Sequence, residues 1–257
     1  MKKMPFIIAG NWKMNPTNLK EAKKLFAVYK QLAKKYSNYR YYSYVPSLYL
    51  EPLARVARAG GMRLGAQNIY FQDSGSYTGA VSIPMVQDVG VESVLIGHSE
   101  RRNLFGVSEE MIGKKITQAI GHNMPMTVCF GESIRDEQGD YTEELERQLE
   151  TIMTPFVNSR KTKLLTLAYE PVWAIGAGAK RPVTEDELFS TLLLIKKIVA
   201  THIGENLTKQ VPILYGGSVN AENAQQLSQV PGVGGFLIGR ASLGKQSMDD
   251  ISKYISQ

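Results

Sequence analysis

The sequence contains a single cysteine, Cys129, among 257 residues. One thiol cannot form an intramolecular disulfide, and it excludes zinc sites that need several cysteines. A chain without disulfides is typical of a reducing compartment, so we expect a cytoplasmic location. The apolar stretch near the N-terminus, residues 6–10, is too short for a secretion signal or a membrane span, so we expect no membrane partner.

No strong clustering of charge occurs either, although 30 basic and 24 acidic residues give a formal net charge of +6. Nucleic-acid-binding proteins usually gather basic residues and aromatics in one stripe. Here the basic residues are spread over helical patterns that also contain acidic residues, as on solvated helix faces. The tyrosines around Arg40 fit a packed strand better than a base-stacking platform. We therefore expect no nucleic-acid partner, although the net charge hints at an anionic partner of a kind that it does not specify.

No linker or low-complexity segment divides the chain, which predicts a single domain over residues 1–257. Short apolar runs alternate with longer amphipathic stretches. The runs mostly lack strict polar–apolar alternation, as expected for strands buried on both faces. Eight strands are predicted at residues 6–10, 41–45, 62–66, 93–97, 126–130, 164–169, 211–215 and 235–238.

Helical patterns lie between these strands. Thr184 followed by Glu187 predicts a capping box at the start of a helix over residues 185–203. Eight strands that alternate with helices favour an α/β fold of the single (β/α)8 TIM barrel type. A doubly wound open sheet is the alternative, but it does not require eight units.

In such a barrel, functional residues lie where the strands end. Lys13 follows the first strand, although alone it also fits a solvent-facing loop. His98 is the only one of three histidines directly after an apolar strand, and a helix beginning there would keep its imidazole neutral. Glu170 ends the sixth strand, where a buried carboxylate must be paired, hydrogen-bonded or functional.

Glycine-rich turns follow the last three strands. Residues 171–178 combine a stiff Pro-Val-Trp base with a small-residue tip, as a hinged lid would. Residues 216–218 and 239–240 expose backbone N–H groups that a phosphate could approach closely, and the dipole of a following helix would add attraction.

A base, a neutral acid, a fixed cation, a lid and a phosphate cradle together suit proton abstraction beside a carbonyl on a small phosphorylated substrate. The sequence shows no metal-ligand cluster and no dinucleotide fingerprint, so we expect no cofactor. Hydride transfer would need a nicotinamide site, and acyl transfer would need an activated nucleophile.

Four segments, residues 11–15, 97–102, 169–176 and 215–219, closely resemble the triosephosphate isomerase family, in order, within residues 7–243. The resemblance implies a cofactor-independent isomerase of glycolysis and gluconeogenesis. Such an enzyme interconverts dihydroxyacetone phosphate and D-glyceraldehyde 3-phosphate through an enediol(ate), and this family is the type case of that chemistry.

The resemblance also implies residue roles. Glu170 would move a proton between two carbons, neutral His98 would shuttle one between the substrate oxygens, and Lys13 would offset negative charge. The residues implied to bind substrate are Asn11, Lys13, Gly176, Ser218, Gly239 and Arg240. The residues implied to support the site are Ser99, Glu100, Gly216 and Gly217.

Three features depart from the family pattern. The lid hinge reads Ala179-Lys180-Arg181, which puts the lid kinetics in question. Arg240 stands where glycine is common. Ala80 replaces a usual glutamate that pairs with the arginine matching Arg101, so we expect weaker packing of its loop.

That loop, Gln67–Ser82, is long, lacks periodicity and carries several aromatic side chains. Long loops in compact domains are usually functional, and exposed aromatics mark partner sites. In the resembling family the loop inserts into a second subunit, where its threonine, here Thr78, reaches the region of Asn11 and Lys13. The resemblance therefore implies a homodimer.

Two other functions stay open. Another phosphate-binding barrel isomerase, for example one acting on a phosphoribosyl substrate, would not predict Lys13, His98 and Glu170 together. A non-catalytic binding protein on the same scaffold would typically have lost Glu170 or Lys13, and both are present.

Overall fold

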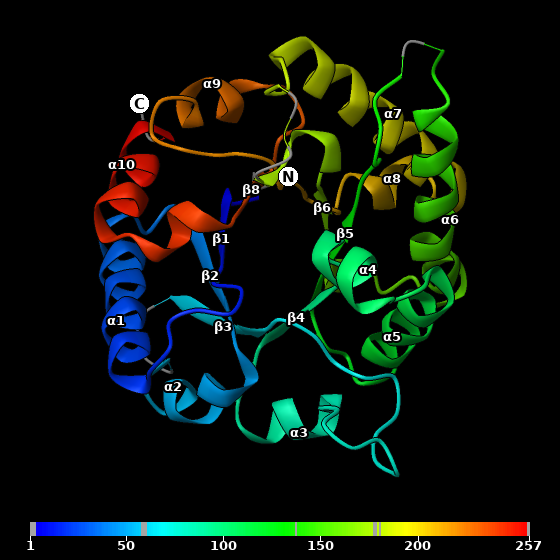
Figure 1. Cartoon of the computed structure of the whole chain (residues 1–257). Coiled ribbons are helices and arrows are strands. Elements are labelled where there is room, and N and C mark those ends of the chain that lie inside the picture. The colour runs from blue at the N-terminus through cyan, green and yellow to red at the C-terminus, as the bar shows by residue number, and fades with distance from the viewer. Residues whose placement is uncertain (1–3, 58–60, 137, 177–178, 180, 256–257) are drawn as a thin grey trace.

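The computed structural model describes residues 4–57, 61–136, 138–176, 179 and 181–255. Eight strands form a closed barrel in which every neighbouring pair is parallel and the first strand pairs with the last (Figure 1). The strands are β1 (Ile7–Asn11), β2 (Arg40–Val45), β3 (Met62–Ala66), β4 (Ser93–Ile96), β5 (Met126–Phe130), β6 (Leu165–Tyr169), β7 (Ile213–Tyr215) and β8 (Gly235–Ile238). The predicted (β/α)8 barrel is confirmed.

Helices surround the barrel as an outer ring (Figure 1). They are α1 (Leu19–Lys35), α2 (Leu50–Ala57), α3 (Ile83–Asp88), α4 (Ser99–Phe105), α5 (Glu109–Gly121), α6 (Tyr141–Ser159), α7 (Glu185–Ile203), α8 (Glu205–Thr208), α9 (Ala224–Gln229) and α10 (Lys245–Ile255). Short 3-10 turns lie at η1 (Ser47–Tyr49), η2 (Thr162–Leu164), η3 (Val172–Ala174) and η5 (Arg240–Leu243). Within the described residues, no helix has both the length and the apolar character needed to cross a bilayer.

The predicted strand at residues 211–215 is shorter than expected, because β7 begins only at Ile213. The Val211 N–H closes a turn by donating to the Thr208 carbonyl over 3.1 Å. Pro212 has no N–H to donate, but its carbonyl accepts from Leu167. The residues before Ile213 therefore finish the preceding turn, and the hydrophobicity of Val211 reflects its burial there.

The barrel interior is filled by side chains and is not a pore. Tyr44 is fully buried, and its hydroxyl contacts Ser93 Oγ at 3.0 Å and Thr127 Oγ1 at 2.6 Å. Gly65 makes room for this ring, since a β-carbon there would lie 2.4 Å from it. Burial raises the pKa of Tyr44, so the phenol stays protonated and the interior stays uncharged.

The start of α7 carries the predicted capping box. Thr184 Oγ1 accepts from the Glu187 N–H, and the Glu187 carboxylate accepts from the Thr184 N–H. Arg181, from the unusual lid hinge, donates to both Glu187 oxygens at 2.8 and 2.5 Å and stacks 4.8 Å from the Trp173 ring centre. Arg181 thus ties the end of the β6–α7 loop to its beginning. Lys180 lies outside the described residues.

We expect Glu187→Gln to lower stability at neutral pH. Arg181 and the Thr184 N–H hold the pKa of Glu187 at about 2, below its ordinary 4.5. A carboxyl whose pKa falls on folding adds stability above its unfolded pKa, and that stability is lost as the pH drops through its folded pKa. Because Arg181 is half exposed, solvent screens the pair, and we expect a loss of about 0.5–1 kcal/mol at pH 7.

Urea unfolding of both forms at pH 7, 4 and 3 would measure this difference, which should shrink as the pH falls from 4.5 towards 2. Glu185→Gln is the matched control, because Glu185 lies in the same first turn without the Arg181 contacts. A Glu187→Gln effect no larger than that of the control would show that only the helix dipole matters.

Candidate active site

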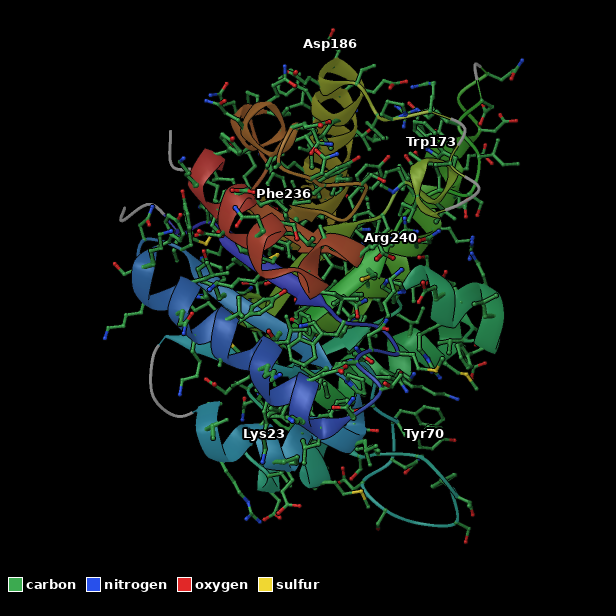
Figure 2. All side chains as sticks on the ribbon, turned by 60° about the vertical axis from the view of Figure 1, so that its left-hand side comes forward. Lys23, Tyr70, Trp173, Asp186, Phe236 and Arg240 are labelled. Carbon is green, nitrogen blue, oxygen red and sulfur yellow. The ribbon has the colours of Figure 1, made fainter. Side chains whose placement is uncertain are left out.

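A cavity of about 520 Å³ opens where the strands end. The predicted residues that line it come from five strand ends: Asn11, Lys13, His98, Glu170, Gly176, Gly216, Gly217, Ser218, Gly239 and Arg240. Figure 2 shows Trp173, Arg240 and Tyr70 on the side of the molecule where the strands end. The other two predicted residues, Ser99 and Glu100, do not line the cavity but bond to residues that do.

Lys13 is held in an uncommon conformation at the end of β1. Its φ is 53°, in the left-handed region that non-glycine residues rarely adopt. The Lys13 N–H donates to Asn11 Oδ1 at 3.0 Å, and its carbonyl accepts from Gln67 Nε2 at 2.9 Å. Its ammonium lies 2.5 Å from Glu100 Oε1. Contacts at both ends of the residue fix the position of this cation.

Glu170 and His98 face each other across the cavity floor. Glu170 is only 3% exposed, and one oxygen accepts from the Ser99 N–H at 2.9 Å. The other oxygen lies 3.2 Å from His98 Nε2. His98 caps α4, and its Nδ1 accepts from the Glu100 N–H at 3.2 Å. Since Nδ1 accepts, the ring proton belongs on Nε2, and a neutral imidazole fits the helix start that the sequence predicted.

Gly216 and Cys129 lie beside the Glu170 side chain. A β-carbon on Gly216 would lie 2.9 Å from Glu170 Cγ, so only glycine fits there without moving the side chain. Cys129 lies in the barrel interior and is fully buried. Burial, and after it the charge of Glu170, raises the pKa of this thiol well above its ordinary value. Cys129 therefore remains a thiol and is no nucleophile.

The other end of the cavity offers backbone donors. The N–H groups of Ser218, Gly239 and Arg240 donate to no other described residue. The sequence also predicted that a helix would follow each of the two glycine-rich turns and attract the phosphate through its dipole, and the structure has this arrangement only after Gly239. A 3-10 turn, η5, begins at Arg240, but α9 begins at Ala224, well beyond Ser218, so its dipole cannot act there. The Lys13 side chain passes close by, with its Cε 3.4 Å from a β-carbon built on Gly239.

Two positioning residues were missed in the sequence. Gln67 Nε2 donates to the carbonyls of Lys13 and Tyr44, at 2.9 and 3.0 Å. Glu132 is fully buried, and its Oε1 accepts from Tyr169 Oη and Trp173 Nε1, both at 2.8 Å, which anchors the lid base. Both follow strand ends, β3 and β5, so the strand-end criterion applied to every strand would have found them.

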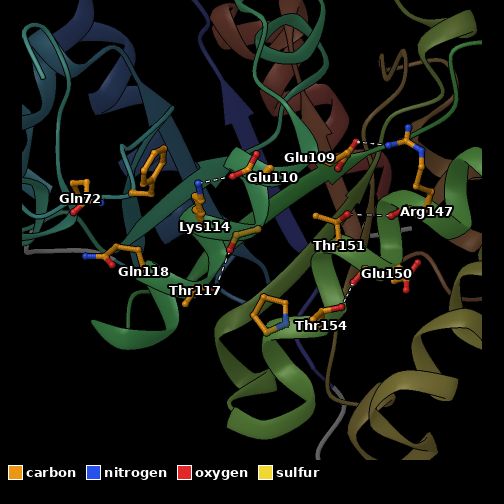
Figure 3. A pocket seen from close by; sticks show the side chains of 13 residues that line it. Gln72, Glu109, Glu110, Lys114, Thr117, Gln118, Arg147, Glu150, Thr151 and Thr154 are labelled. Carbon is orange, nitrogen blue, oxygen red and sulfur yellow. Dashed lines mark hydrogen bonds and ion pairs between the residues drawn. The ribbon is translucent and has the colours of Figure 1, made fainter.

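A larger groove of about 750 Å³ lies elsewhere, between α5 and α6 (Figure 3). Both of its cations are already paired with carboxylates, Lys114 with Glu110 at 2.5 Å and Arg147 with Glu109 at 3.7 Å. No titratable residue of the predicted site lines it. Among the described residues, no group of three histidine, cysteine or acidic side chains could hold a metal ion.

Known proteins resemble this chain over nearly its whole length. Residues 6–255 match the family described as triosephosphate isomerase. Triosephosphate isomerases from Francisella philomiragia subsp. philomiragia, Clostridium botulinum and Acetivibrio thermocellus are 39%, 37% and 34% identical to it. The alignments each cover 96% of this chain and 96%, 98% and 97% of those proteins. The chain therefore belongs to the triosephosphate isomerase family.

Proposed function

We propose that residues 1–257 form one catalytic domain that interconverts dihydroxyacetone phosphate and D-glyceraldehyde 3-phosphate, in glycolysis and gluconeogenesis in the cytoplasm. The observation that supports this most is the meeting of Glu170, His98 and Lys13 in one cavity, opposite unpaired backbone N–H groups. A carboxylate base, a neutral N–H donor and a fixed cation are the groups that proton transfer beside a carbonyl needs.

In the proposed reaction each of these groups has a role that the resemblance implies. The Glu170 carboxylate removes a proton from the carbon beside the substrate carbonyl and returns it to the adjacent carbon. His98 donates its Nε2 proton to the developing enediolate oxygen and takes a proton back from the neighbouring oxygen, so no net charge is left on the ring. The Lys13 ammonium stabilises negative charge on the enediolate and phosphate.

The phosphate would lie against the backbone N–H groups of Gly176, Ser218, Gly239 and Arg240, as the resemblance implies. Arg240 is exposed, and its side chain makes no hydrogen bond or ion pair to any described residue, so the guanidinium is available to add positive charge at this end. The lid extends over residues 171–178, of which 177 and 178 lie outside the described residues. Its closure would exclude water, which strengthens these interactions and protects the enediolate from eliminating phosphate.

Glu170→Gln should lower kcat by about 10²–10⁴-fold or more, because it keeps the side-chain size but removes the base. Substrate affinity should change little, since the N–H groups that face the phosphate are untouched. A coupled assay starting from dihydroxyacetone phosphate measures both quantities, and an unchanged melting temperature would exclude misfolding. Near-native kcat in this variant would assign Glu170 a structural role and overturn the proposal.

His98 should be a neutral imidazole at pH 7, protonated at Nε2 and not at Nδ1. The structural reason is that Nδ1 already accepts from the Glu100 N–H. Nitrogen NMR of 15N-histidine-labelled protein distinguishes the two ring nitrogens, and His122 and His202 serve as internal references. A proton on both nitrogens of His98 at pH 7 would contradict the proposed acid.

We further propose a homodimer formed through the Gln67–Ser82 loop. This loop leaves the barrel on the side where the strands end, as Tyr70 shows in Figure 2. Tyr77 near its tip is 42% exposed, and Met14 and Phe105, which line a cavity at its base, are 92% and 63% exposed. Large apolar side chains gathered around one cavity support a protein partner, and a second copy of this chain would cover them symmetrically.

The dimer proposal predicts that specific activity falls on dilution in step with dissociation, because Lys13 lies beside the proposed interface. Tyr77→Asp should raise the dissociation constant by about tenfold or more, since interface aromatics carry much of the binding energy. Leu193→Asp on α7, also exposed, is the matched control outside the interface. Sedimentation velocity and activity over one dilution series decide the matter, and a fully active monomer at every concentration would refute it.

A further inference from the structure

The hydroxyl of Tyr29 connects helix α1 to the turn that follows β8. Tyr29 is fully buried on the inner face of α1, and α1 lies next to α10 in the outer ring (Figure 1). The Tyr29 hydroxyl donates to the Ser242 carbonyl over 3.0 Å. Ser242 belongs to η5, which begins at Arg240, directly after Gly239. A side chain of the helical ring therefore bonds to the backbone at the phosphate end of the active site.

Gly10 leaves the space that this hydroxyl occupies. Gly10 lies in β1 and pairs with Ile238 of β8, the residue before Gly239. A β-carbon built on Gly10 would lie only 1.9 Å from the Tyr29 hydroxyl oxygen. A larger residue at position 10 would therefore displace either the phenol or the strand. Glycine inside a strand weakens it and often marks such a close approach.

The Ser242 carbonyl depends on this one donor. Ser242 is fully buried, and no other described residue donates a hydrogen bond to its carbonyl. The preceding carbonyl, that of Ala241, accepts from both the Gly244 N–H and Ser247 Oγ. A buried acceptor that loses its partner is costly, because no water replaces the lost bond. Without the phenol, the η5 backbone would have to move to find another donor.

Two further bonds link Ser242 to the active-site cavity. The Ser242 N–H donates to the Gly239 carbonyl over 2.9 Å and closes the η5 turn. The Ser242 Oγ donates to the Asn11 carbonyl over 3.3 Å, at the end of β1. Gly239, Arg240 and Asn11 all line the cavity. The position of Ser242 therefore restricts how Gly239 and Arg240 present their N–H groups there.

The phenol is held in place and remains a donor. The Trp12 ring packs against it, with 6.1 Å between the ring centres, and Trp12 is itself fully buried. Burial raises the pKa of Tyr29, so the hydroxyl keeps its proton at neutral pH. The bond to Ser242 is therefore a permanent part of the folded barrel.

We propose that Tyr29 is a positioning residue for phosphate recognition, whose hydroxyl holds η5 so that the N–H groups of Gly239 and Arg240 face the phosphate of the substrate. This inference rests on the proposed function, because it takes these N–H groups as phosphate donors. Tyr29 does not line the cavity and acts only through Ser242. The phosphate is bonded to a carbon that does not react, so a displaced η5 should weaken the substrate complex and the transition state equally.

Tyr29→Phe tests the inference, because it removes the hydroxyl and keeps the ring. The KM for dihydroxyacetone phosphate should rise about 3–10-fold, as expected when part of a hydrogen bond to a charged group is lost. The kcat should stay within about twofold of wild type. The dissociation constant of inorganic phosphate, measured by phosphorus NMR titration without turnover, should rise by the same factor as KM. The melting temperature should fall by about 2–4 °C.

Tyr41→Phe is the matched control. Tyr41 is also fully buried, and its hydroxyl donates to Ser252 Oγ on α10 over 2.8 Å, but neither residue lines the active-site cavity. This variant should lose a similar amount of thermal stability and keep the KM and phosphate affinity of wild type.

The phosphate titrations decide the matter. An unchanged phosphate dissociation constant in Tyr29→Phe, or an equal rise in both variants, would overturn the inference. A fall in kcat with KM unchanged would also overturn it. Absence of turnover in the wild type would instead overturn the isomerase proposal, and the comparison of phosphate affinities would still test the role of Tyr29.

Discussion

Closure of eight parallel strands into one barrel is the constraint on which the site depends. Because each strand runs in the same direction, all eight end at one rim, and residues far apart in the chain become neighbours there. Lys13, His98 and Glu170 come from β1, β4 and β6, and each lies within two residues of a strand end. The hydrogen-bonded sheet fixes the strand ends, so the positions of these three side chains depend first on rigid elements, and loop contacts such as that of Gln67 complete them.

The Lys13–Glu100 ion pair lies between the active-site cavity and the Gln67–Ser82 loop. Lys13 lines the cavity that contains Glu170, and both Lys13 and Glu100 line the cavity beside the Gln67–Ser82 loop. The unusual backbone of Lys13 is stabilised by Gln67, which belongs to the same loop. A change in that loop would therefore act directly on Lys13, without any long-range path.

The sequence predicted the strands well, because strands buried on both faces are continuous apolar runs. It also predicted the Thr184–Glu187 helix cap, because the capping motif lies within four consecutive residues. It also located Lys13, His98 and Glu170, since charged groups at buried strand ends are conspicuous. Gln67 and Glu132 were missed because their roles depend on contacts with residues distant in sequence. The prediction that a helix dipole acts near Ser218 was wrong, because α9 begins only at Ala224. The position where a helix begins depends on how the preceding loop folds.

Because Cys129 is buried, its reactivity with thiol reagents reports transient opening of the barrel. The thiol is fully buried in the barrel interior and stays protonated, so thiol reagents cannot reach or activate it while the barrel is closed. Cys129 can be modified only after the strands around it separate. When the reagent is dilute, the rate of modification therefore measures how often the barrel interior becomes accessible. Since no other cysteine is present, one mass increment counts these events without background. A cysteine introduced at an exposed position such as 193 could also carry a probe selectively, because the native thiol would not compete in the folded state.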